Sequence, residues 1–90
     1  MPLRPPSAAR AGAFRMKLRR DLAATIAERI HRQGLTQVRA AALLGISQPR
    51  LNSLLNGRAE LFSLDALVDL AQRTGLSVTV RATRPYATRN

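Results

Sequence analysis

The middle of this chain contains two short apolar patterns separated by three residues around Gly45. The first pattern follows Thr36 and covers about 37–44, and the second follows Ser47 and covers about 48–55. Threonine and serine are preferred helix N-caps because their side-chain oxygen accepts a hydrogen bond from an unpaired backbone N–H. Glycine adopts the positive φ that a tight turn requires. The sequence therefore predicts two short helices joined by a tight turn.

Two further helices are predicted, one on each side of this pair. Apolar side chains recur every fourth residue from Leu18 to Ile30, which predicts a helix over about 16–33. A last helix is predicted over about 64–74, with Ser63 as its N-cap. Each of these patterns is followed by a glycine, as is common at helix C-termini. The expected core is thus mostly α-helical.

After the fourth predicted helix, the period of the apolar pattern changes from that of a helix to that of a strand. Leu76, Val78 and Val80 alternate with polar residues, which predicts a short β-strand that ends before Pro85. A lone strand leaves its backbone N–H and C=O groups without partners. Pairing with a second copy, which would make it a dimerisation strand, is the preferred hypothesis, and pairing with the sheet edge of another protein stays open.

Length and composition fit one small domain. The chain has 90 residues, and 46 % of them are hydrophobic, which is enough to form a compact core. We predict a flexible basic arm at 1–15, the folded domain at 16–82 and a loose tail at 83–90. Both Met1 and Met16 stay open as the native start.

The charge distribution favours a polyanionic partner. Fifteen Lys and Arg against five Asp and Glu give a formal net charge of +10. Residues 1–20 carry six of the basic residues and no acid, and residues 36–58 also contain no acid. Each phosphate contact releases counterions, whereas a carboxylate on the same surface would oppose binding. The sequence therefore indicates binding to nucleic acid.

Several other function classes are disfavoured. There is no cysteine, the lone His31 has no cluster of acids beside it, and no glycine-rich phosphate loop is present. The five acids are scattered, without a pair placed for acid–base chemistry. We therefore expect no enzyme activity, no metal and no cofactor. No stretch approaches the ~20 apolar residues that span a bilayer, so no membrane partner is expected.

The two short helices together predict a helix-turn-helix, whose second helix enters the major groove of DNA. That second helix carries polar or short side chains suited to contacts with base edges. The predicted base-reading residues are Gln48, Pro49, Arg50, Asn52 and Ser53.

On these residues the chain resembles the Cro/repressor-type (Xre family) helix-turn-helix domains, over about 17–82. The matching positions are Leu35, Thr36, Gln37, Ala41, residues 44–48, Leu51 and residues 54–58. Residues 47–51 and 61–67 further resemble the HigA-type antitoxin subgroup. The resemblance implies a mostly α, four-helix Cro/repressor-like fold, here with a C-terminal strand in place of the usual fifth helix.

The resemblance also implies phosphate contacts and a function. The expected phosphate-contacting residues are Thr36, Gln37, Ser47, Asn56 and Arg58. Apart from the resemblance, the charge of the basic segment 1–20 predicts further phosphate contacts that depend strongly on salt. The implied function is that of a transcriptional repressor, which would bind an inverted-repeat operator as a homodimer. Its expected location is the bacterial cytoplasm, at operator DNA of the nucleoid. The repressor would be the antitoxin of a type II pair with a RelE/HigB-type toxin, autoregulating its operon. A stand-alone or phage-type regulator without a toxin is the alternative.

Overall fold

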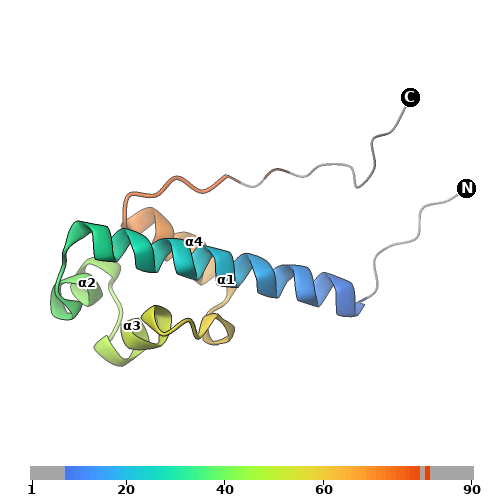
Figure 1. Ribbon diagram of the computed structural model, residues 1–90, viewed down its shortest axis with the longest axis horizontal. Helices are drawn as coiled ribbons and strands as arrows, with labels where there is room; N and C mark the ends of the chain where they lie inside the picture. Colours follow the sequence, from blue (N-terminus) through green and yellow to red (C-terminus); the bar gives the residue numbers. More distant parts are fainter. Residues whose placement is uncertain (1–7, 80, 82–90) are drawn as a thin grey trace, which may run out of the picture.

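The computed structural model describes residues 8–79 and residue 81, and these form a helical body with one long helix along its length (Figure 1). The elements in chain order are α1 (Ala8–Gln33), α2 (Gln37–Leu44), α3 (Gln48–Leu55), the 3-10 helix η1 (Ala59–Leu61) and α4 (Leu64–Arg73). Helix α1 packs against α4, η1 and α3, while α2 packs against α3 and α4. The predicted four-helix body is therefore confirmed, and η1 is an element that the sequence pattern did not reveal.

Three of the four α-helices begin at the predicted caps. The side-chain oxygens of Thr36, Ser47 and Ser63 each accept a hydrogen bond from the backbone N–H three residues further on, at 3.1–3.2 Å. All three residues have extended backbone, as N-caps require. Because these caps fix where α2, α3 and α4 start, they also fix which side chains of each helix face the core.

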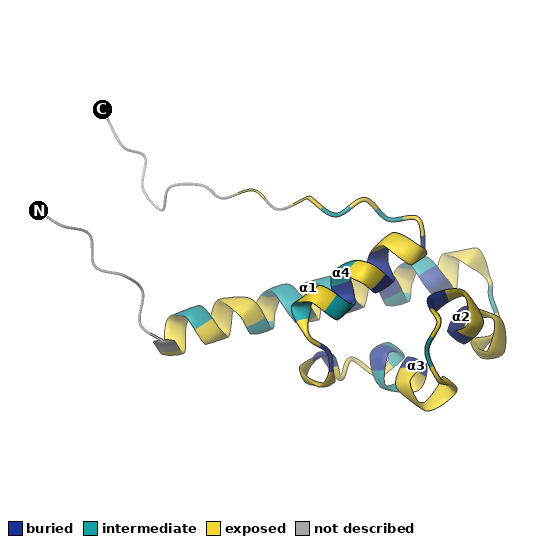
Figure 2. Cartoon of the chain, turned by 180° about the vertical axis from the view of Figure 1, so that it is seen from behind, coloured by how far each residue is buried: buried dark blue, intermediate teal, exposed yellow. Residues whose placement is uncertain are grey.

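The core lies where α1 and α4 meet the shorter helices, and it is formed mainly by small and branched aliphatic side chains (Figure 2). Its largest fully buried side chains are Ile26, Leu44, Leu51, Leu54, Phe62 and Leu67. Buried alanines, among them Ala40, Ala41 and Ala71, lie between these larger groups. Because their side chains are single methyl groups, the helices can approach closely.

The N-terminal end of α1 differs from the prediction. The expected helix started at about 16 and left 1–15 as an arm, whereas α1 begins at Ala8, so residues 8–15 are helical. The physical reason is local: this segment consists largely of alanine and arginine, which have high helix propensity, and it contains no proline. The remaining arm residues 1–7 and the predicted tail at 83–90 lie outside the described residues.

The predicted C-terminal strand is also not found. Residues 76–79 and 81 belong to neither a helix nor a strand, and the part of the chain that the structure describes contains no β-strand. Leu76 and Val78 are half-buried against the core, which accounts for the alternating pattern without a sheet. A strand needs backbone hydrogen bonds to a neighbour, and the described residues of a single chain offer no second strand. Val80 lies outside the described residues.

The segment after α4 is attached to α1 by hydrogen bonds to one carbonyl. Arg29 Nε and Gln33 Nε2 donate to the backbone oxygen of Thr74 at 3.1 and 3.3 Å. Thr74 itself is buried, and its hydroxyl donates to the Ala71 carbonyl at 2.7 Å. From there, residues 76–79 run on the side of α1 opposite to α3 (Figures 1 and 2). Over 8–79, the helices are all too short or too polar to cross a bilayer.

Candidate nucleic-acid interface

Helices α2 and α3 are joined by a turn whose geometry is fixed by backbone hydrogen bonds. The N–H of Gly45 donates to the Ala42 carbonyl at 3.2 Å, and the N–H of Ile46 donates to the Ala41 carbonyl at 3.1 Å. Gly45 has φ 68°, the left-handed conformation predicted for it. Ala41, the acceptor of the second bond, is buried with 4 % of its surface exposed. The turn therefore sets the angle at which α3 leaves α2.

Helix α3 lies below α1 and α4 in Figure 1, and most of its exposed residues are polar. Leu51 and Leu54 are fully buried and hold α3 on the core. Gln48, Pro49 and Asn52 are exposed. Because residues three and four positions apart are neighbours on a helix surface, Asn52 lies beside both Gln48 and Pro49, and the three form one exposed surface. The arrangement presents donors and acceptors of a rigid helix to solvent, as major-groove recognition requires.

Two of the predicted base-reading side chains have partners within the protein. The Ser53 hydroxyl donates to the Pro49 carbonyl at 3.2 Å, and Ser53 is half-buried. The Arg50 guanidinium lies over the Phe62 ring, 4.2 Å from its centroid. Arg50 therefore joins α3 to the residue that precedes the cap of α4. The structure brings Gln48, Pro49 and Asn52 together at the surface, whereas Ser53 bonds within α3 and Arg50, which is also exposed, places its guanidinium over Phe62.

The predicted phosphate-contacting residues surround this surface. Thr36 and Ser47 cap α2 and α3 as described, and their hydroxyl hydrogens remain for an outside acceptor. Gln37, the first residue of α2, is exposed. The N-terminal amides of a helix together with its dipole favour an anion. At the C-terminal end of α3, Asn56 and Arg58 are exposed as well.

Arg58 is paired with an acid just beyond the acid-free stretch 36–58. Its Nε donates to Glu60 Oε2 at 2.6 Å, and both side chains are at least half exposed. This hydrogen bond, together with one from the backbone of Glu60, holds the pKa of the Glu60 carboxyl below its usual value. Glu60 therefore stays ionised near neutral pH and reduces the positive charge that Arg58 offers to a phosphate.

The tertiary contacts of this region could not be found from sequence. Arg50 and Phe62 are twelve positions apart, and their contact requires η1, which has no periodic signal of its own. The pairing of Arg58 with Glu60 has a visible signal, because opposite charges two residues apart can meet around a turn. His31 is exposed, and no group of three or more His, Asp or Glu within the described residues could hold a metal ion.

Comparison with known proteins agrees with this geometry. A protein-family model described as a helix-turn-helix domain matches residues 7–83, which is most of the chain. The match includes all of α1 to α4 together with the turn at Gly45. No curated protein matches the chain.

Proposed function

The chain belongs to the helix-turn-helix domain family, and on this premise we propose that it is a sequence-specific repressor that binds double-stranded DNA through α3. The observation that carries the proposal is the exposed face of Gln48, Pro49 and Asn52 on a helix held by fully buried leucines. A rigid helix with an exposed polar face can enter the major groove, where each base pair has a distinct pattern of donors and acceptors. Occupation of an operator would block RNA polymerase.

A homodimer on an inverted repeat suits this mode of binding. Two recognition helices about 34 Å apart match one turn of B-DNA. The segment 76–79 lies on the opposite side of α1 from α3, so pairing there would leave the DNA-binding surface open (Figure 1). We propose that the two copies of such a dimer meet along this segment.

The narrower proposal is that this regulator is the antitoxin of a type II toxin–antitoxin pair and represses its own operon. Its support is the resemblance of residues 47–51 and 61–67 to HigA-type antitoxins. The alternative is a stand-alone or phage-type regulator. A neighbouring gene of toxin size, whose product binds this chain and loses its toxicity, would favour the antitoxin. Either role is one of binding without catalysis, in the bacterial cytoplasm.

The experiment that tests base reading compares two glutamine-to-alanine variants. Gln48→Ala alters the exposed face of α3, whereas Gln72→Ala makes the same change at an exposed position of α4. The DNA is the upstream region of the gene, with excess random competitor at near-physiological salt. We expect Gln48→Ala to cost about 1–3 kcal/mol at the cognate site and little on random DNA, with Gln72→Ala unchanged on both.

Two results would contradict this assignment. Equal losses on cognate and random DNA for Gln48→Ala would remove its role in base reading. If excess random DNA abolishes binding of the wild-type chain to the upstream region, both with and without the neighbouring gene product, the proposal of sequence-specific repression is contradicted.

A further inference from the structure

The N-terminal half of α1 extends past the buried residues of the core, although its Met16 still packs against them, and it carries most of the net charge of the described residues. Helix α1 has 26 residues, which corresponds to about 39 Å. No residue from Ala9 to Leu22 is buried, and the buried positions of α1 begin at Ala23. We call residues 8–20 the projecting half of α1. Its five basic residues, with no acid among them, are Arg10, Arg15, Lys17, Arg19 and Arg20.

This charge arrangement is unfavourable for the free protein. The five cations of the projecting half repel one another, and Arg10, in the first turn, also meets the partial positive charge of the helix N-terminus. The first turn of α1 contains no acid. Within the described residues, Lys17 is paired with Asp21 at 2.7 Å, whereas Arg15 and Arg20 have neither an ion pair nor a hydrogen bond. A polyanion lying along this half would remove the unfavourable interaction.

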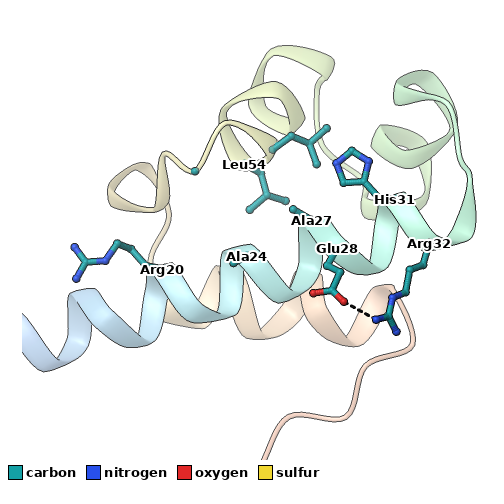
Figure 3. A pocket seen from close by; sticks show the side chains of 9 residues that line it. Arg20, Ala24, Ala27, Glu28, His31, Arg32 and Leu54 are labelled. Carbon is teal, nitrogen blue, oxygen red and sulfur yellow. Dashed lines mark ion pairs between the residues drawn. The ribbon is translucent and has the colours of Figure 1, made fainter.

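One side of the projecting half continues the surface at the C-terminal end of α3. A hollow of about 680 Å³ lies between α1 and that end of α3, and its walls include Arg20, Ala27, Leu54 and Gly57 (Figure 3). Gly57 lies between Asn56 and Arg58, which are the predicted phosphate contacts after the recognition helix. Arg20 is therefore on the border of the same surface as these contacts.

Helical spacing extends that border toward the N-terminus. Arg10, Lys17 and Arg20 are separated by seven and three residues, so they lie on one side of α1. Arg15, five residues before Arg20, lies about 140° around the helix. At the other end of the hollow, Arg32 is paired with Glu28 at 2.7 Å (Figure 3). The unpaired charge of the hollow is thus at its Arg20 end.

The inclination of α1 agrees with this extension. In Figures 1 and 2, the N-terminal end of α1 slopes toward the side of the molecule on which α3 and η1 lie. We infer that the projecting half is a second DNA contact, in which Arg20 binds a phosphate that follows those at the C-terminal end of α3, and Lys17 exchanges its ion pair with Asp21 for a second phosphate. This inference rests on the proposed DNA binding. It implies a longer footprint along the duplex, in which the additional contacts come from a helix and not from a flexible arm.

The test uses variants of equal charge change on two sides of the same helix. Arg20→Gln and Lys17→Gln/Arg20→Gln remove the inferred contacts, and Arg15→Gln is the control. Glutamine and arginine have similar helix propensity, so circular dichroism should show unchanged helix content. Each lost phosphate contact makes the negative slope of log K against log salt less steep by about 0.9. At ~0.1 M salt this corresponds to about eightfold weaker binding than that of the wild type.

The expected result is a smaller slope and weaker binding for Arg20→Gln, a larger effect for the double variant, and little change for Arg15→Gln. Shortening the duplex to the bases read by α3 should make Arg20→Gln and wild type bind alike. If Lys17→Gln/Arg20→Gln binds the specific site with an unchanged salt slope and an unchanged footprint, the inference is overturned while the proposed function stands. An acidic protein surface would then be the better partner for these cations. Absence of any specific binding by the wild type would instead overturn the proposed function, and the inference with it.

Discussion

Replacing Gly45 by alanine tests whether backbone conformation at the turn controls the stability of this domain. Gly45 has φ 68°, and this left-handed conformation costs an alanine about 1–2 kcal/mol. The loss of backbone freedom in the unfolded chain offsets about 0.4–1 kcal/mol of that. An added Cβ would lie 2.9 Å from Nη1 of Arg73, so the arginine must move.

The displaced arginine contributes little to the total. Its Nε donates to Asp69 Oδ2 at 3.0 Å, and both side chains are more than half exposed. Breaking such an exposed pair costs about 0.3–0.5 kcal/mol. The net expected destabilisation of Gly45→Ala is therefore about 1 kcal/mol, measured by urea denaturation followed by circular dichroism.

Two further variants separate the backbone from the side-chain contact. Gly57 has φ 78° with nothing within 4 Å of an added Cβ, so Gly57→Ala should cost nearly as much as Gly45→Ala. In an Arg73→Ala background, the cost of Gly45→Ala should fall by only about 0.3–0.5 kcal/mol. The backbone argument is refuted if Gly45→Ala destabilises the wild type by more than about 3 kcal/mol but destabilises the Arg73→Ala variant only as much as Gly57→Ala does. Full stability of Gly45→Ala would also refute it.

Three other changes have outcomes set by the structure. Leu51→Ala, at a fully buried position, should cost about 2–5 kcal/mol in urea denaturation, whereas Leu61→Ala, at a position 49 % exposed, should cost far less. Ser47→Ala should cost about 1 kcal/mol in the same assay because the N-H of Arg50 loses its cap; an unchanged midpoint would contradict the capping role. Because the folded pKa of Glu60 is lowered, its contribution to stability is present above the unfolded pKa and is lost as the pH falls through the folded pKa; Glu60→Gln should therefore lessen the loss of stability in acid, and an identical pH profile would argue against the Arg58 contact.

Local signals carried most of what the sequence predicted. Thr36, Ser47 and Ser63 were predicted as caps, and each accepts the expected backbone hydrogen bond, because capping depends only on residues within one turn. The helices that follow were placed with the correct start for the same reason. The exposed face of Gln48 and Asn52 followed from the periodicity of α3.

The errors arose where a pattern has two physical explanations. Alternation at Leu76 and Val78 fits a strand, but it also fits an unpaired segment with one side packed on the core, which is what the structure has. The start of α1 was missed because helix propensity, and not an apolar stripe, makes residues 8–15 helical. The contact of Arg50 with Phe62 depends on the tertiary arrangement around η1 and leaves no pattern in the sequence.

The aromatic ring beneath Arg50 has a consequence for spectroscopy. The chain contains no tryptophan, and of its two phenylalanines Phe62 is buried while Phe14 is 62 % exposed. Phe62 is therefore the source of the ring-current field inside the described core. Since the Arg50 guanidinium lies 4.2 Å from the ring centroid, the side-chain protons of Arg50 should resonate upfield of the other arginines. Their chemical shifts give a direct signal of whether α3 stays against η1 when DNA is added.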